Sequence, residues 1–365
     1  MKIAFIGVKG IPYGGGIEKF TEEIGSRLVV RGHEVTVYCD NVFCNSAVSY
    51  KGMHLKPLWS MKHPFYQKVS NSLVATIRVL LDSDVDVVHL HSIASLFAFS
   101  TKIAGLKTVA HVHSFEWKKN KWTSVVRFFL RLSDYFAGQF ADRVVVVSES
   151  LFKYFNEISR VEVTLLQNGV DQSAYVPPDL IKRYGLSRNS YILYIGRLSR
   201  EKGIFDLVEV YKSLKTDKIL VLAGEFADDR KFRDTLTKAI GQDRSILRVG
   251  YVDGQMKAEL LSNAYMAIFP AEIEGSPVAL LEAMSYGNCC LVSDIEGHLE
   301  IMNSFGYTFS VGDRESLRSS LSLLLSQKKS ADRHKGDAKK HVLSKYLWDK
   351  TVDEYEKMCM SLLKR

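Results

Sequence analysis

Two glutamates, Glu274 and Glu282, stand eight positions apart in a segment whose sequence predicts a strand, a loop and a helix. Ser276 and Pro277 suit the N-cap and the first position of this helix, and Gly287 suits the residue just past its end. The free N–H groups and the dipole at a helix start favour a phosphate. Carboxylates on either side of a phosphate can accept hydrogen bonds from hydroxyl groups, as a sugar nucleotide would require.

Two cations, Arg197 and Lys202, follow another predicted strand in the run Gly-Arg-Leu-Ser-Arg-Glu-Lys-Gly, residues 196–203. Their separation across a strand-to-helix turn lets both side chains point to one place. There they would neutralise a diphosphate and the negative charge that develops as it departs. The alternative is a pair of solvated cations on a surface loop.

Three glycines, residues 14–16, lie between the first predicted strand and a helical segment. Glycine allows the backbone to approach a phosphate closely. The triplet lacks the Gly-x-Gly-x-x-Gly spacing of dinucleotide-binding proteins, so a dehydrogenase is not favoured. We expect Glu18 to cap or brace the helix, and an acceptor-facing role is the alternative.

Four histidines form two pairs, His89 with His91 and His111 with His113, and each pair shares one face of a predicted strand. Such an arrangement could hold a metal ion. No cysteine or carboxylate cluster completes a zinc site, however, and we predict no metal site.

Three aspartates, Asp82, Asp84 and Asp86, superficially form the Asp-x-Asp motif that binds a metal–diphosphate complex in a different transferase fold. Here they lead directly into a strand. We interpret them as residues of the strand start rather than as metal ligands.

Apolar runs and helical patterns alternate along the chain in two series, which predicts two doubly wound α/β domains with parallel sheets. Asn168-Gly169 followed by Pro177-Pro178 predicts a hinge between them. The predicted strands are 2–6, 34–38, 85–89, 108–113 and 143–147, then 191–195, 218–223, 246–249, 266–269 and 289–292. The predicted helices are 17–31, 204–214, 231–239, 255–264, 277–286 and a last one over 332–365.

Four motifs in this order resemble the glycosyltransferases of family 4, which are retaining enzymes of the GT-B fold. They are residues 15–18 (Gly-Gly-Ile-Glu), residues 168–171 (Asn-Gly-Val-Asp), the run 196–203 and the pair Glu274 and Glu282. The resemblance covers nearly the whole chain.

The resemblance implies two Rossmann-like domains that face a central cleft. Residues 1–170 would form the acceptor-side domain and residues 171–344 the donor-binding domain, with a helix at about 345–365 packing back on the first. Two segments, 7–12 and 116–122, are most similar to the polysaccharide rhamnosyltransferase branch of the family.

The resemblance also implies transfer of a sugar from a nucleoside-diphosphate sugar to a glycan or lipid-linked acceptor, with no metal ion and no other cofactor. Glu282 would hold the ribose, Glu274 the donor sugar, and His113 would lie near that sugar, where the rhamnosyltransferase branch often has Asp. The implied catalytic residues are Glu274, Arg197, Lys202 and His113, and the implied donor-binding residues are Gly15, Gly16, Arg197, Lys202, Glu274, Gly275, Ser276, Val278 and Glu282. Another GT-B enzyme, such as a sugar-nucleotide epimerase, and a non-catalytic partner subunit are the alternatives.

The composition, with 46% hydrophobic and 25% charged residues, is that of a globular protein, and 365 residues exceed the usual size of one core. No run of 18 apolar residues exists, so no membrane span is expected. Five cysteines without zinc spacing predict a reduced, cytosolic protein.

The net charge of +8 predicts an anionic partner, and no nucleic-acid motif is present. Cations alternate with aromatic residues over 117–131, which predicts a helix on the anionic inner face of the plasma membrane, beside a lipid-linked acceptor. A solvated helix with a core-facing aromatic stripe is the alternative. The expected apolar face is Trp122, Val125, Val126, Phe129 and Leu130, and the flanking cations are Lys118, Lys119, Lys121, Arg127 and Arg131.

Overall fold

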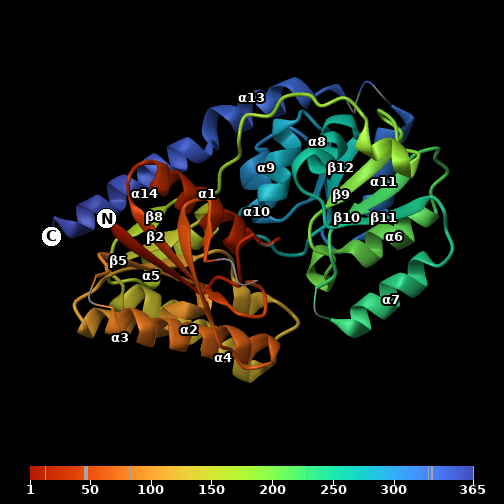
Figure 1. Cartoon of the computed structure of the whole chain (residues 1–365). Helices are drawn as coiled ribbons and strands as arrows, with labels where there is room; N and C mark the ends of the chain where they lie inside the picture. Colours follow the sequence, from red (N-terminus) through yellow and green to blue (C-terminus); the bar gives the residue numbers. More distant parts are fainter. Residues whose placement is uncertain are drawn as a thin grey trace. The chain divides into compact units, whose positions relative to one another are not determined.

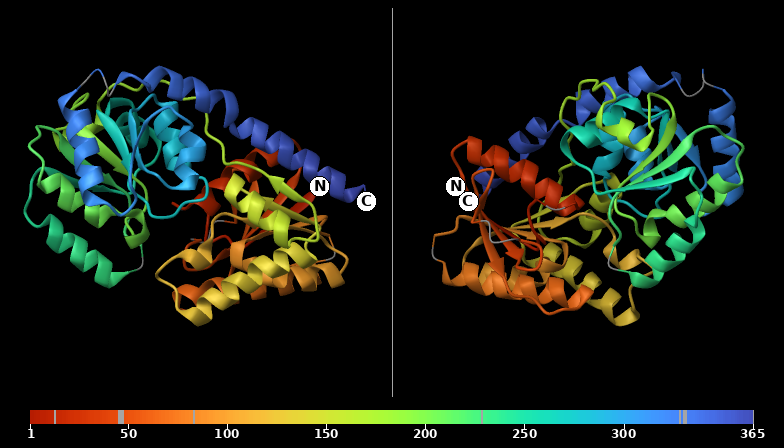
Figure 2. Two further views of the ribbon diagram at one scale, coloured as in Figure 1. Left: turned by 180° about the vertical axis from the view of Figure 1, so that it is seen from behind. Right: turned by 45° about the vertical axis from the view of Figure 1, so that its right-hand side comes forward.

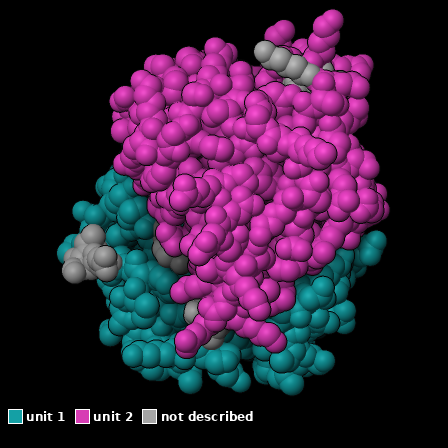
Figure 3. All heavy atoms as spheres, turned by 90° about the vertical axis from the view of Figure 1, so that its right-hand side faces the viewer, with its two compact units in different colours: residues 1–168, 348–365 teal, residues 169–347 magenta. Residues whose placement is uncertain are grey.

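The computed structural model describes residues 1–12, 14–44, 48–82, 84–227, 229–327, 329 and 332–364. The chain divides into two compact units, each with its own sheet and its own helices (Figures 1 and 2). Unit 1 contains residues 1–168 and 348–365, and unit 2 contains residues 169–347 (Figure 3).

The sheet of unit 1 has the strand order β3-β4-β2-β1-β5-β6-β7-β8 and is parallel except for β3. The central strand β5 is buried along its whole length, and its neighbour β6 is buried from Thr108 onward, as expected where helices cover both faces. The strands are β1 (Lys2–Ile6), β2 (Glu34–Asp40), β3 (Ser49–Tyr50), β4 (Met53–Leu58), β5 (Val87–His91), β6 (Lys107–Val112), β7 (Arg143–Val146) and β8 (Val163–Leu165).

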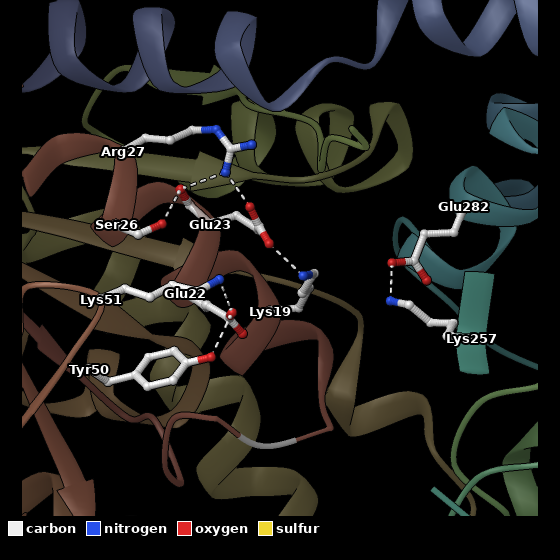
Figure 4. A network of polar contacts seen from close by, with 9 residues as sticks. All are labelled: Lys19, Glu22, Glu23, Ser26, Arg27, Tyr50, Lys51, Lys257 and Glu282. Carbon is white, nitrogen blue, oxygen red and sulfur yellow. Dashed lines mark hydrogen bonds and ion pairs between the residues drawn. The ribbon is translucent and has the colours of Figure 1, made fainter. Parts of the chain in front are cut away.

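The longest helices of unit 1 flank this sheet, and the C-terminal helix packs on the first one. Arg31, just after α1, forms ion pairs of 2.5 Å with Asp353 and 2.6 Å with Glu356 of α14. On α1 itself, buried Glu23 pairs with Lys19 and Arg27 (Figure 4). The helices are α1 (Gly16–Val30), α2 (Pro64–Leu81), η1 (Ser92–Phe97), α3 (Ala98–Ile103), η2 (Glu116–Lys118), α4 (Ser124–Phe140), α5 (Glu149–Ile158) and α14 (Trp348–Leu363).

The sheet of unit 2 is wholly parallel in the order β11-β10-β9-β12-β13-β14, with one apolar cluster on each face. The strands are β9 (Tyr191–Ile195), β10 (Ile219–Ala223), β11 (Ile246–Gly250), β12 (Met266–Phe269), β13 (Cys290–Ser293) and β14 (Tyr307–Phe309). The helices are η3 (Leu180–Tyr184), η4 (Arg200–Lys202), α6 (Ile204–Lys212), α7 (Arg230–Ile240), α8 (Gly254–Asn263), α9 (Val278–Ser285), α10 (Glu296–Met302), α11 (Arg314–Ser326) and α13 (Lys335–Lys345).

The expected strands and helices are present, with bounds that shift by at most three residues, but the single last helix is wrong. The chain leaves helical geometry at Tyr346 and re-enters it at Trp348, so that α13 and α14 are separate. The backbone carbonyl of Tyr346 accepts a hydrogen bond of 2.7 Å from the N–H of Val170, which fixes the break. Arg365 lies outside the described residues.

The expected helix over 117–131 is also wrong in its first half. Only a single 3₁₀ turn forms there, and α4 begins at Ser124, where the Thr123 hydroxyl accepts a hydrogen bond from the N–H of Val126 at 3.4 Å.

The expected apolar face of this segment is split between core and solvent. Leu130 is buried, with Trp122 and Val126 half-buried beside it, whereas Val125 is 66% exposed and Phe129 40% exposed. The aromatic residues thus serve partly as core, as the alternative interpretation held. Among the described residues, no helix has the length and hydrophobicity to cross a membrane.

Candidate active site

Two lysine–glutamate ion pairs hold Glu274 and Glu282. Glu274 follows β12 and pairs with Lys202, which follows β9. Because β9 and β12 are parallel neighbours, their carboxyl ends meet at one edge of the sheet. Glu282 lies on α9 and accepts a hydrogen bond of 2.7 Å from Lys257 Nζ on α8 (Figure 4). Sequence reasoning missed Lys257, because nothing in its local pattern distinguishes it from other helix lysines.

The turn that carries Lys202 rests directly on the loop that carries Glu274. Gly203 ends η4 with a φ of +66°, and a Cβ atom there would lie 2.0 Å from the carbonyl oxygen of Pro270. The N–H of Glu272 donates to the carbonyl oxygen of Glu201 at 2.9 Å. Only glycine permits this approach, which brings Lys202 to Glu274.

A second close backbone contact shapes the loop that carries Arg197. Gly224, after β10, has a φ of +151°, and a Cβ atom there would lie 1.9 Å from the carbonyl oxygen of Gly196. The hydroxyl of buried Tyr194 donates to the carbonyl oxygen of Arg197 at 2.9 Å. The Arg197 side chain itself is exposed, so it is available to an anionic ligand.

The loop before α9 departs in detail from its expected form. The helix begins at Val278 with Pro277 as N-cap and no side-chain cap, so the N-cap role predicted for Ser276 is wrong. Ser276 and Gly275 are buried. Gly287 follows the helix with a φ of +77°, which confirms its predicted place.

His298, on α10, is a further residue of this region that sequence reasoning missed. Its Nδ1 lies 3.1 Å from the carbonyl oxygen of Ser293, so Nδ1 carries the proton. Burial lowers its pKa to about 4, although Glu274 opposes that shift. His298 is therefore neutral at physiological pH. A Cβ atom on the preceding Gly297 would lie 2.5 Å from the carbonyl oxygen of Glu274, which shows how closely α10 packs on this loop.

The remaining predicted site residues, Gly15, Gly16 and His113, belong to unit 1. Gly15 is the N-cap of α1, and a Cβ atom there would lie 2.0 Å from Glu18 Oε2. Glu18 Oε1 accepts a hydrogen bond of 3.1 Å from the N–H of Lys9. Glu18 therefore braces the loop before α1, as predicted.

The four histidines lie side by side at the carboxyl ends of β5 and β6. Each histidine of β5 forms a hydrogen bond with a histidine of the neighbouring strand segment. His89 Nε2 lies 3.2 Å from His111 Nδ1, and His91 Nδ1 lies 2.9 Å from His113 Nε2. Burial lowers the pKa values of His89, His91 and His111 well below the usual range, and that of His113 to about 3. All four rings are therefore neutral.

Ring nitrogens of His89, His91 and His111 lie within 4.8 Å of one another, as metal ligands could. Most of these nitrogens already have hydrogen-bond partners: Tyr355 for His89 at 2.8 Å, and Thr21 for His91 at 3.1 Å. The cluster is therefore a hydrogen-bonded network, and the expectation that it holds no metal stays a prediction.

A hollow in unit 1 lies beside the loop after β1. Its lining includes Lys9 and Lys68 together with Asp40 and Asn71. Burial lowers the pKa of Lys68, although Glu116 opposes that shift. No motif or spacing in the sequence pointed to Lys68.

Comparisons with known proteins cover both units. The family model for glycosyltransferase family 4 matches residues 14–174, and the model for glycosyl transferases group 1 matches residues 179–341. The chain is 27% identical to the UDP-Gal:alpha-D-GlcNAc-diphosphoundecaprenol alpha-1,3-galactosyltransferase of Escherichia coli over 276 residues, 70% of each chain.

Solved structures resemble the whole chain. Sucrose-phosphate synthase of Thermosynechococcus elongatus has a TM-score of 0.84 at 18% identity and covers 100% of this chain and 99% of its own. Anabaena HepE in complex with UDP and glucose has a TM-score of 0.82 at 18% identity, over 99% of this chain and 100% of its own. These likenesses show the two-domain GT-B fold.

The Gly203 contact yields a prediction with a matched control. Gly203→Ala should lower the free energy of unfolding more than Gly185→Ala, because Gly185 has a similar φ of +70° but no described atom within 4 Å of the place its Cβ would take. Both variants carry the cost of a left-handed alanine, and only Gly203→Ala adds a clash with Pro270, which costs about 1–3 kcal/mol. Urea unfolding measures the difference, and equal losses would contradict the role given to this contact.

Proposed function

We propose that this chain, which belongs to the GT-B glycosyltransferases, moves a sugar from a nucleoside-diphosphate sugar to a glycan or lipid-linked acceptor in bacterial surface polysaccharide biosynthesis. The observation that carries the proposal is the pairing of Lys202 with Glu274 at the edge where β9 and β12 end. A cation and a carboxylate held together there match the phosphate and the hydroxyl groups of such a donor.

In this proposal the ion pairs exchange partners when the donor binds. Lys202 and Arg197 meet the diphosphate, and Glu274 is released to accept a hydrogen bond from the donor sugar. Glu282 likewise exchanges Lys257 for the ribose hydroxyl groups. The side chains of Lys202 and Glu274 are 21% and 19% exposed, so the exchange occurs in a partly desolvated place where electrostatic interactions are strong.

We propose that the reaction retains the configuration of the sugar and uses no metal ion. The bond from the sugar carbon to the diphosphate oxygen breaks, and the acceptor oxygen bonds to that carbon on the same face. The acceptor proton passes to the departing diphosphate, whose charge Lys202 and Arg197 stabilise. No enzyme carboxylate acts as nucleophile in this scheme. Similarity to family 4 supports it.

The names of the relatives support a UDP-sugar donor and a lipid-diphosphate acceptor. One relative is named for UDP-galactose and a diphosphoundecaprenol acceptor, and HepE has a complex with UDP and glucose. The further proposal that the transferred sugar is rhamnose is supported by the similarity of residues 7–12 and 116–122 to the rhamnosyltransferase branch.

Replacing either cation tests the donor site. With a lipid-diphosphate acceptor present and a panel of UDP-, GDP- and dTDP-sugars, the wild type should transfer the sugar of one donor and release its nucleoside diphosphate. Lys202→Ala or Arg197→Ala should cut this turnover on the order of 10²–10³-fold. Lys231→Ala, at an exposed lysine of α7, is the matched control. Wild-type turnover in Lys202→Ala with an unchanged melting temperature would refute the assignment.

Removing divalent metal tests the charge scheme. Turnover of the wild type should persist in excess EDTA, because two cationic side chains already meet the diphosphate. A loss of activity that only Mg²⁺ or Mn²⁺ restores would contradict metal independence and implicate Asp84, Asp86 or the histidines.

We also propose that α4 and its neighbours meet the anionic inner face of the membrane. Val125 and Phe128 on α4 are 66% and 61% exposed, and Ile103 on α3 is 72% exposed. Lys118 and Lys121 lie over the rings of Phe115 and Trp122 at 4.0 and 4.9 Å, whereas Lys119 is paired with Glu116. Lys118 is thus better placed than Lys119 to attract anionic lipid.

Vesicle co-sedimentation tests this surface. The protein should bind vesicles containing anionic lipid and release as salt rises, since each cation near the surface contributes roughly 1 kcal/mol. Lys118→Glu with Lys121→Glu should weaken binding. The same charge change at exposed Lys231 and Lys238 of α7 is the control. Equal binding to neutral and anionic vesicles, or none to either, would leave only a solvated surface.

A further inference from the structure

We propose that Thr21 and His91 are positioning residues that hold His113 in its Nε2–H form, so that His113 Nδ1 accepts a hydrogen bond from a substrate hydroxyl. The inference rests on the proposed function for the presence of that hydroxyl. The three side chains form one hydrogen-bonded line from α1 through β5 to the end of β6.

The direction of the line is set at Thr21. This residue is fully buried on α1, and its hydroxyl donates to the carbonyl oxygen of Ile17 at 2.8 Å. A hydroxyl has one proton, so its oxygen can only accept from the next group. That group is His91 Nε2, at 3.1 Å. His91 therefore carries its proton on Nε2.

The assignment at His91 determines the one at His113. Each buried neutral imidazole carries one proton, so Nδ1 of His91 is a bare acceptor. Nε2 of His113 lies 2.9 Å from it and must donate. Nδ1 of His113 is then the acceptor left at the end of the line. His113 directly follows β6 and is only half-buried, unlike the other three histidines.

A second line of hydrogen bonds in the cluster, from Tyr355 through His89 to His111, does not reach a partly exposed ring. Tyr355, His89 and His111 are all buried, and His111 Nε2 has no hydrogen-bond partner among the described residues. Of the two lines, it is the one from Thr21 that ends at a partly exposed ring. The charged groups that face His113 are Glu116, which raises the pKa of His113, and Lys68, which lowers it.

A neutral acceptor selects for a donor group on the substrate. A hydroxyl group can donate to Nδ1, whereas an anionic oxygen cannot. In the other tautomer, His113 Nδ1 would carry the proton, and the same hydroxyl group could accept a hydrogen bond from it. Fixing the proton therefore fixes the orientation of the hydroxyl and removes an alternative mode of binding.

The experiment combines ¹⁵N-histidine NMR with kinetics. In wild-type protein, His113 should show a bare Nδ1 and a protonated Nε2 between pH 6 and 9. Thr21→Val should give a mixture of the two forms and lower kcat/KM for the donor roughly 5- to 20-fold, the loss expected for about one hydrogen bond. Thr21→Ser should restore both. Thr76→Val is the matched control, because Thr76 is buried on α2 and donates to Ser72 at 2.8 Å in the same way.

Three results would overturn the inference: a protonated Nδ1 on His113 in the wild type, a Thr21→Val protein with unchanged tautomer and unchanged kcat/KM, or stoichiometric Zn²⁺ binding that shifts the signals of His89, His91 and His111. The wild-type spectrum decides the tautomer even where Thr21→Val fails to fold. It also does so where no donor is turned over, which separates this inference from the proposed function.

Discussion

Charge at the carboxyl edge of the second sheet has to be compensated locally, and much of the site depends on that requirement. Lys202 and Glu274 are largely withdrawn from solvent, so either one without a partner would carry a desolvation cost. The pair forms because η4 and the loop after β12 meet at Gly203 and Pro270, where no side chain intervenes. The contact that stabilises this ion pair therefore also places a cation and a carboxylate where the proposed sugar-nucleotide donor would need them.

Much of this arrangement was predictable from the sequence, because the carboxyl ends of parallel strands lie at the same edge of their sheet. Once β9 and β12 are recognised as buried apolar runs, the residues after them must lie at one edge, and β1, β9 and β12 have the predicted bounds. Lys202 and Glu274 are 72 residues apart in sequence and still meet. The partner of Glu282 was not predictable, since Lys257 reaches it only through the packing of α8 against its neighbours.

The two wrong helix predictions, over 117–131 and 332–365, have the same physical origin: helix ends depend on hydrogen bonds that the hydrophobic periodicity of the sequence does not show. The helical pattern across 117–131 continues through the point where Thr123 starts a new helix, so a face drawn over both parts mixes buried Leu130 with exposed Val125. The pattern across 332–365 likewise continues through Tyr346, whose carbonyl is held by Val170. In both cases a hydrogen bond at one residue decides the end of a helix, and hydrophobic periodicity does not report it.

The candidate donor site of unit 2 and the histidine cluster of unit 1 hold their polar groups in different ways, and this difference suits different tasks. Unit 2 keeps charged side chains and pairs them, which suits a ligand whose phosphates and hydroxyl groups can take over each partner. Unit 1 gathers four histidines that hydrogen-bond to one another and to hydroxyl groups, and burial keeps every ring neutral. A neutral ring has one donor and one acceptor, so a line of such rings transmits a direction rather than a charge. The buried end of that line, on α1, then determines what the exposed end can bind, and a helix residue remote from any ligand acquires a part in specificity.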